Sequence, residues 1–136
     1  GKTFLSSCIA KVVSEKGFSV AYDTAIRIFS SYESVKFSSV DAADAARRIR
    51  KYEQCDLLIV DDLGTEMATA FTTSALYGLL ADRLMHRRPM IINTNLLPAA
   101  LESRYSPAIA SRLIGEFKQL RFFGDDIRAQ KRLHGL

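Results

Sequence analysis

Apolar residues recur along this chain in two alternating patterns. In the first pattern they lie three to four positions apart, as Leu5, Ile9 and Val12 do, which is the spacing of one helix face. In the second pattern they form short continuous runs such as 57–60, which are typical of strands buried on both faces of a parallel sheet. Strands that alternate with helices predict an α/β fold with a mainly parallel sheet.

These patterns assign most of the chain to helices and strands. A first helix follows Thr3 and ends at Lys16-Gly17, and a later helix carries an apolar stripe over 42–49 and basic residues near its end. The remaining predicted helices are 25–34, 71–87, 106–117 and 126–133, and the predicted strands are 18–22, 57–60, 90–92 and 120–123.

Two local features refine this prediction. Ser38 stands three residues before Asp41, a spacing that predicts an N-terminal cap for the helix with the 42–49 stripe. In the helix over 25–34, the spacing places Ile26 and Phe29 on one face.

Composition and charge place the chain among ordinary globular proteins. Its 136 residues are 48% hydrophobic and 25% charged, and without a linker-like or repeated segment they predict a single domain over 1–136. The apolar runs are too short for a membrane span and no signal-peptide pattern is present, so we expect a cytoplasmic protein with no membrane partner, whose Cys8 and Cys55 are reduced and packed. The net charge of +4 permits nucleic-acid contact without requiring it.

The chain opens on Gly1-Lys2-Thr3, the last three residues of the phosphate-binding pattern G-x-x-x-x-G-K-[ST]. In that motif backbone N–H groups surround phosphates, the lysine reaches the β- and γ-phosphates, and the Thr hydroxyl binds Mg²⁺. Taken alone, three residues are equally consistent with a lysine at a helix start, so the interpretation depends on the rest of the chain.

A second motif agrees with the first. The apolar run 57–60 ends in Asp61-Asp62, the Walker B pattern, at the strand end where open α/β sheets place their ligands. Asp61 is the predicted Mg²⁺ ligand, and Asp62 is predicted to orient or deprotonate the attacking water. Glu66 is a second candidate for the base, and the alternative is a pair of solvent-facing carboxylates in a turn.

Taken in order, these motifs and three later ones resemble the AAA+ ATPase domain of bacterial helicase loaders of the DnaC/DnaI type and of the similar IstB-like ATP-binding proteins. The resemblance covers nearly the whole chain and implies a P-loop NTPase, a RecA-like three-layer sandwich. The segments that carry it are Gly1-Lys2-Thr3, Asp61-Asp62-Leu63-Gly64, 91–95, Ser111-Arg112-Leu113 and 124–128.

The resemblance also implies further site residues. Asn95 matches the sensor 1 residue between Walker B and the γ-phosphate, with Asn93 as the alternative. Arg112 matches the arginine finger, which reaches the ATP of a neighbouring subunit, with Arg104 as the alternative. Arg128 falls where the family places its sensor 2 arginine, within a helix that equally suits a basic tail.

The family pattern places a strand and a glycine-rich segment before Gly1. We therefore expect the natural protein to be longer, and expect the missing strand to lie between the strands 90–92 and 120–123. Without that segment, the chain as given is expected to bind ATP weakly or not at all, because backbone amides of the full loop hold the phosphates.

Clusters of basic residues at 47–51, 83–88 and 121–132 lie beside a loop that has Tyr32, Phe37 and Phe29 near it. Aromatic side chains next to basic ones can stack the bases of single-stranded DNA. Solvated helix faces beside core aromatics are the alternative interpretation, and the sequence favours it.

The resemblance implies an ATPase that uses ATP and Mg²⁺, forms homo-oligomers when ATP is bound, contacts single-stranded DNA and delivers a replicative helicase. One alternative is an IstB-like helper whose partner is a transposase. A second alternative is a non-catalytic AAA+ remnant that binds DNA or protein without hydrolysing ATP.

Overall fold

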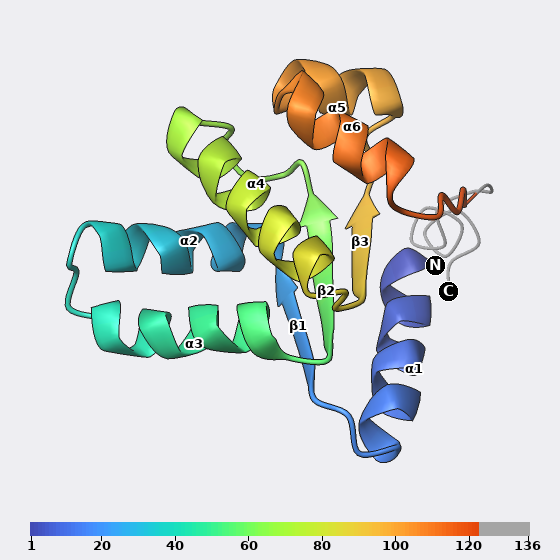
Figure 1. Cartoon of the computed structure of the whole chain (residues 1–136), viewed down its shortest axis with the longest axis horizontal. Coiled ribbons are helices and arrows are strands. Elements are labelled where there is room, and N and C mark those ends of the chain that lie inside the picture. Colours follow the sequence, from blue (N-terminus) through green and yellow to red (C-terminus); the bar gives the residue numbers. More distant parts are fainter. Residues whose placement is uncertain (123–136) are drawn as a thin grey trace, which may run out of the picture.

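The computed structural model describes residues 1–122, in which helices and strands alternate as predicted (Figure 1). The elements are α1 (Lys2–Glu15), β1 (Val20–Thr24), α2 (Ala25–Lys36), α3 (Ala42–Gln54), β2 (Leu57–Leu63), α4 (Ala70–Met85), β3 (Met90–Thr94), α5 (Pro98–Arg104) and α6 (Pro107–Gly115).

The three strands form a parallel sheet in the order β1-β2-β3, with β2 in the centre. Val20 pairs with Leu57 on one side of β2, and Leu58 pairs with Met90 on the other side. Because all three strands run the same way, their carboxyl ends meet at one edge of the sheet, where α/β folds bind ligands.

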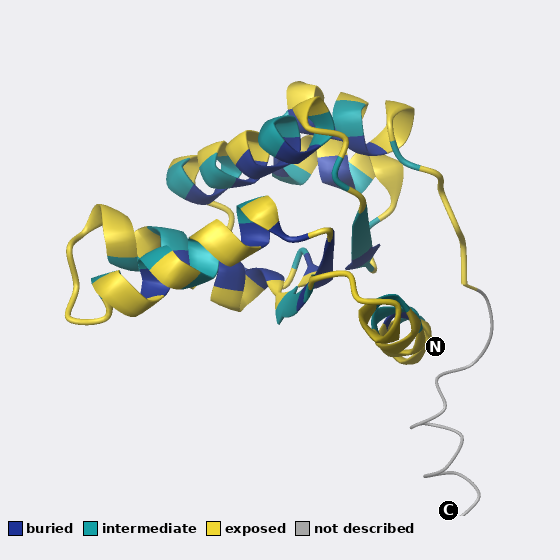
Figure 2. Cartoon of the chain, turned by 60° about the horizontal axis from the view of Figure 1, so that its bottom comes forward, coloured by how far each residue is buried: buried dark blue, intermediate teal, exposed yellow. Residues whose placement is uncertain are grey.

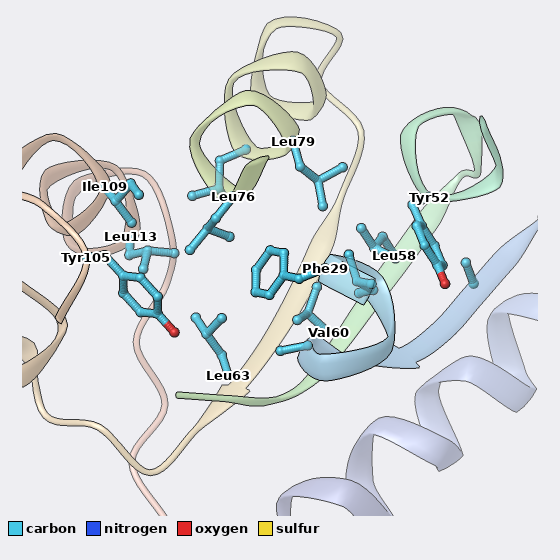
Figure 3. Close-up of a cluster of buried hydrophobic side chains, with 14 of the residues drawn as sticks. Phe29, Tyr52, Leu58, Val60, Leu63, Leu76, Leu79, Tyr105, Ile109 and Leu113 are labelled. Atoms are coloured by element: carbon cyan, nitrogen blue, oxygen red, sulfur yellow. The ribbon is translucent and has the colours of Figure 1, made fainter. Parts of the chain in front are cut away.

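The main hydrophobic core lies between one face of this sheet and the helices α2, α4 and α6 (Figure 3). Leu58 and Val60 of the central strand contribute to this core, so the alternate residues of β2 point to the opposite face. The buried core residues are Ala21, Ala25, Ile28, Phe29, Tyr52, Cys55, Leu58, Val60, Leu63, Leu76, Leu79, Leu80, Leu101, Tyr105, Ile109 and Leu113.

The other face of the sheet is covered by α1, which contacts all three strands and completes the predicted three layers (Figures 1 and 2). Its apolar positions are less buried than the sequence pattern suggests: Leu5 is 41% exposed and Val12 is 51% exposed. Ser6 is the buried residue of this helix. The helix therefore meets the sheet through a polar contact, which matters for the site below.

Side-chain caps explain where several helices begin. Thr24 accepts a hydrogen bond from the Arg27 backbone N–H at the start of α2, and Thr69 forms a capping box with Thr72 at the start of α4. The cap predicted from Ser38 does not form: the N-cap of α3 is Asp41, and its side chain makes no capping bond. The helix packs against α2.

Several other predictions are corrected. Ile26 is 54% exposed while Phe29 is buried, because Ile28 takes the core position beside Phe29. Pro98 begins α5, a helix that the sequence analysis missed. Residues 120–122 form no strand, and Phe123 and the predicted helix 126–133 lie outside the described residues.

The two cysteines lie apart and neither forms a disulfide. Cys55 is buried as expected, whereas Cys8 is exposed on α1. Among the helices of residues 1–122, none is both long enough and apolar enough to cross a membrane.

Candidate functional site

The site is centred on Asp61, near the end of the central strand β2. Its side chain is 6% exposed and lies on the face of the sheet that α1 covers. The neighbouring Asp62 is exposed and has a positive φ of 54°, at an irregularity where the register between β2 and β3 shifts. One carboxylate is thus held inside the protein and the next faces solvent.

The first turn of α1 brings the N-terminal motif to Asp61. The Thr3 hydroxyl lies 3.1 Å from Oδ2 of Asp61 and 3.4 Å from Oδ1. Gly1 is the N-cap of this helix and provides no side-chain cap, so the first N–H groups of α1 keep their capacity to bind an anion. The two motifs, far apart in sequence, therefore meet at one point.

Lys2 joins the end of β3 to the same cluster. Its Nζ donates a hydrogen bond of 2.7 Å to Oδ1 of Asn95. Asn95 is exposed, at the edge where the strands end. The structure thus brings together Lys2 and Asn95, as well as Thr3 and Asp61.

Asn93, the alternative sensor residue, occupies a different position. It is 8% exposed, and its Nδ2 donates to the Ser6 hydroxyl at 2.8 Å and to Oδ1 of Asp61 at 3.2 Å. Asn93 therefore ties α1 to the central strand from inside. Asn95, beside Lys2, has the accessible amide.

Tyr22 on β1 completes the surroundings of Asp61, and the sequence analysis missed it. Its hydroxyl lies 3.2 Å from Oδ2 of Asp61 and 3.5 Å from the backbone oxygen of Thr3. Burial and the negative charge of Asp61 raise the pKa of Tyr22, so this hydroxyl remains a donor at neutral pH. The parallel register, which pairs Tyr22 with Ile59, two residues before Asp61, was the signal that could have found it.

The charge of Asp61 has no cationic partner within residues 1–122: its neighbours there are neutral donors, and no ion pair involves it. A buried, unbalanced carboxylate beside a hydroxyl is a suitable pair of oxygen ligands for Mg²⁺. In this part of the chain, no three or more His, Cys, Asp or Glu side chains are placed so that they could hold a metal ion together. A cation held by Thr3 and Asp61 would thus need further oxygen ligands, such as phosphates and water.

Glu66, the second candidate base, is 6% exposed, and its carboxylate already accepts hydrogen bonds from other residues. Its carboxylate accepts hydrogen bonds from the Gly64 backbone N–H at 2.8 Å and from the Tyr105 hydroxyl, and Arg104 lies 4.0 Å away. Burial and the bond to Glu66 raise the pKa of Tyr105. This cluster connects the end of β2 to α5 and leaves Asp62 as the exposed carboxylate.

The candidate arginines lie on α5 and α6. Arg112 hydrogen-bonds the Tyr77 hydroxyl at 3.4 Å and lies 3.9 Å from a carboxylate oxygen of Glu116, with its side chain 32% exposed. Arg104 donates to the backbone oxygen of Glu66. The structure brings neither arginine into hydrogen-bond contact with Asp61, and Arg128 lies outside the described residues.

One member of the predicted basic clusters is corrected. Arg83 is 0% exposed, and its guanidinium donates to the backbone oxygens of Tyr52 and Pro89, each at 2.8 Å. These hydrogen bonds join the end of α3 to the residue that precedes β3, and burial lowers the pKa of Arg83. Phe29 is likewise buried in the core, so neither residue is available to nucleic acid.

The fold resembles solved structures of replication proteins. DnaA bound to AMPPCP and single-stranded DNA gives a TM-score of 0.70 at 21% identity over 85% of this chain and 34% of that chain. The AMPPCP-bound DnaA of Aquifex aeolicus gives 0.65 at 22% identity over 85% and 35%, and the DnaC helicase loader gives 0.70 at 19% identity over 88% and 70%. These similarities show that the chain has the α/β fold of AAA+ P-loop NTPases.

Within that class, residues 1–134 match the family model described as IstB-like ATP binding protein. The chain belongs to this family. A relative from Mycobacterium tuberculosis, described as a candidate ATP-binding protein in an insertion sequence, is 28% identical over 139 aligned positions, which are 97% of this chain and 53% of the relative. The chain therefore spans about half the length of that relative.

Proposed function

We propose that this chain is the nucleotide-binding core of an AAA+ ATPase that binds Mg-ATP where α1 meets the ends of β2 and β3. The observation that carries the proposal is the contact of Thr3 with Asp61 at 3.1 Å, which joins two motifs 58 residues apart. Membership in an ATP-binding family supports the same ligand.

Each polar residue of the cluster has a chemical role in this proposal. The free N–H groups after Gly1 and the Lys2 ammonium bind the phosphates, and Asn95, which accepts from Lys2, lies where it can contact the γ-phosphate. Thr3 and Asp61 hold Mg²⁺, which when bound neutralises phosphate charge. The ligand would replace the direct contact between Lys2 and Asn95.

The proposed reaction is hydrolysis of the γ-phosphate. Water attacks the γ-phosphorus, the bond to the bridging oxygen of ADP breaks, and the exposed Asp62 orients the water and accepts its proton. Arg112 acts in a homo-oligomer on the ATP of a neighbouring subunit, because its partners on its own subunit are Tyr77 and Glu116. Arg128 remains the proposed sensor 2 residue.

The biological role we favour is that of a transposition helper whose partner is a transposase. The family match and the insertion-sequence relative support this alternative over a helicase loader. The helicase-loader role, with a replicative helicase as partner, is supported by the similarity to DnaC. The two roles can be separated by affinity capture, in which purified transposase and purified helicase compete for binding to the full-length protein.

Contact with single-stranded DNA belongs to the proposal. Phe37 is 70% exposed next to Phe71, with ring centres 6.1 Å apart, and the Lys36 ammonium lies 4.6 Å from the Phe71 ring centre. A partly exposed aromatic pair with an adjacent cation is a chemically suitable base-stacking surface.

The first prediction tests nucleotide binding in the full-length protein that carries this chain. Lys2→Ala and Asp61→Asn should each lower the affinity for a fluorescent ATP analogue with Mg²⁺ by at least about tenfold, since each removes a charge-assisted contact. Lys11→Ala is the matched control, because Lys11 lies on the same helix and, within residues 1–122, forms its ion pair with Glu15, at 4.0 Å. Unchanged affinity in both site variants would refute the proposed site.

A further inference from the structure

The two oxygens of Asp61 are held by side chains from the two strands that flank β2. Tyr22 on β1 donates to Oδ2 at 3.2 Å, and Asn93 on β3 donates to Oδ1 at 3.2 Å. These strands flank β2, so rotation of the carboxylate about its own bond would break both hydrogen bonds. The pair acts as a clamp, and we use that name for Tyr22 and Asn93 together.

Because the clamp is buried, water cannot easily replace its hydrogen bonds to Asp61. Asp61 is 6% exposed and Asn93 is 8% exposed, so water has little access to the oxygen on the Asn93 side. The Asn93 amide is itself fixed, because the same nitrogen donates to the buried Ser6 hydroxyl at 2.8 Å. The orientation of Asp61 is therefore coupled to the position of α1 on the sheet, and α1 is the helix that carries Lys2 and Thr3.

The donors around Asp61 also distinguish its two oxygens. A carboxylate offers about four lone-pair directions, two on each oxygen. On Oδ1 the donors are Asn93 and the Asp62 backbone N–H, both at 3.2 Å, and on Oδ2 the donor is Tyr22, at 3.2 Å. The Thr3 hydroxyl lies closer to Oδ2, at 3.1 Å, than to Oδ1, at 3.4 Å. Of these four groups, Thr3 is the one that is itself a proposed cation ligand.

From this geometry we infer that Tyr22 is a positioning residue of the cation site: with Asn93 it holds Oδ2 of Asp61 toward Thr3, the side from which a divalent cation is bound. The inference rests on the proposed function and adds to it a residue outside both nucleotide motifs. Tyr22 acts through Asp61 and needs no contact with the nucleotide.

The test compares two tyrosines in the full-length protein. Tyr22→Phe removes only the hydroxyl that reaches Asp61, whereas Tyr52→Phe removes a hydroxyl that donates to Asp23 at 2.6 Å, away from the site. Mn²⁺ affinity of the ATP complex is measured by electron paramagnetic resonance, and affinity for the fluorescent analogue is measured in EDTA. Tyr22→Phe should weaken Mn²⁺ binding roughly three- to tenfold and leave the EDTA affinity within about twofold, and Tyr52→Phe should change neither.

A double-variant cycle tests whether the two residues work as a clamp. Asn93→Leu has a similar side-chain size and removes the donor to Oδ1. If either residue alone can retain the carboxylate, the combined Tyr22→Phe and Asn93→Leu variant should lose more Mn²⁺ affinity than the product of the single losses. Circular dichroism melts of all variants show whether the protein has remained folded.

The outcomes separate the inference from the function on which it rests. Normal Mn²⁺ affinity in Tyr22→Phe, with the wild type binding Mg-ATP, overturns the inference alone. Equal losses with Mn²⁺ and in EDTA also overturn it, because they indicate a general structural defect. Absence of cation-dependent ATP binding in the wild-type full-length protein overturns both.

Discussion

Asp62 and Glu66 are carboxylates four positions apart that occupy opposite environments. Asp62 is exposed, whereas Glu66 is buried and accepts hydrogen bonds from Tyr105 and Gly64. A general base that deprotonates the attacking water must be accessible to that water. Of these two carboxylates, only Asp62 is accessible to solvent. The environment thus supports the assignment that the Walker B spacing predicts.

The second prediction follows from this difference. Asp62→Asn should retain ATP binding and slow hydrolysis by about 10²- to 10⁴-fold, the range for loss of a general base. Asparagine tolerates the positive φ of 54° at this position, so the backbone should not change. Steady-state phosphate release and nucleotide titration measure the two properties separately.

Glu66→Gln is the comparison variant for that experiment. It should reduce thermal stability, because a neutral amide is a weaker acceptor for Tyr105 and Gly64. If Glu66→Gln abolishes hydrolysis at unchanged stability while Asp62→Asn hydrolyses ATP normally, the base is Glu66 and our assignment is wrong.

At the scale of elements, the start of α4 shows how a loop of polar residues determines where a helix begins. The Thr69 hydroxyl accepts from the Thr72 backbone N–H at 3.1 Å, and the Thr72 hydroxyl accepts from the Thr69 N–H at 2.9 Å. The reciprocal bonds satisfy two backbone donors that the first turn leaves free. The helix therefore begins at Ala70 and directs Leu76 and Leu80 into the core.

The third prediction is that Thr69→Ala lowers the free energy of unfolding by about 1 kcal/mol, the usual cost of losing an N-cap. Ser74→Ala is the matched control: Ser74 is exposed within the same helix, and alanine there should be neutral or slightly stabilising. Urea unfolding of both variants measures the difference. Equal effects would show that the capping box contributes nothing specific.

At the scale of the whole molecule, we propose that activity depends on association, with Arg112 as the residue that acts across the subunit interface. Arg112 lies on α6, where its guanidinium is partly exposed and stacks over Tyr77 at 5.2 Å from the ring centre. The Lys2, Thr3 and Asp61 cluster lies where α1 meets β2, and no hydrogen bond or ion pair within residues 1–122 joins Arg112 to it. In the assembly model, the arginine of one subunit completes the site of another.

The fourth prediction tests this model in the full-length protein. Arg112→Ala should retain ATP binding and lose hydrolysis, by on the order of 10³- to 10⁵-fold if it acts as other arginine fingers do. Mixing it with Lys2→Ala should restore part of the turnover, because the second protein supplies the arginine and the first supplies the nucleotide site. Full activity of Arg112→Ala, or unchanged hydrolysis per subunit in a proven monomer, would contradict the model.

The sequence by itself determined the class of fold and the resemblance to an ATP-binding family. The strand over 57–60 and the helices beginning near residues 25 and 71 follow from hydrophobic period and end signals, which are local properties of the chain. The adjacency of Thr3 and Asp61 also followed, because parallel strands and the helix N-terminus meet at one sheet edge.

Only the tertiary structure decided which polar groups are paired. Nothing local in the sequence distinguishes Arg83, which is buried among backbone oxygens, from the solvent-facing arginines near it, or shows that Tyr22 reaches Asp61. Likewise, the two-residue strand period would place Asn93 and Asn95 on the same face, yet Asn93 is buried within β3 and Asn95 is exposed just beyond the end of that strand. Such pairings depend on contacts between residues distant in sequence, and hydrophobic periodicity carries no information about them.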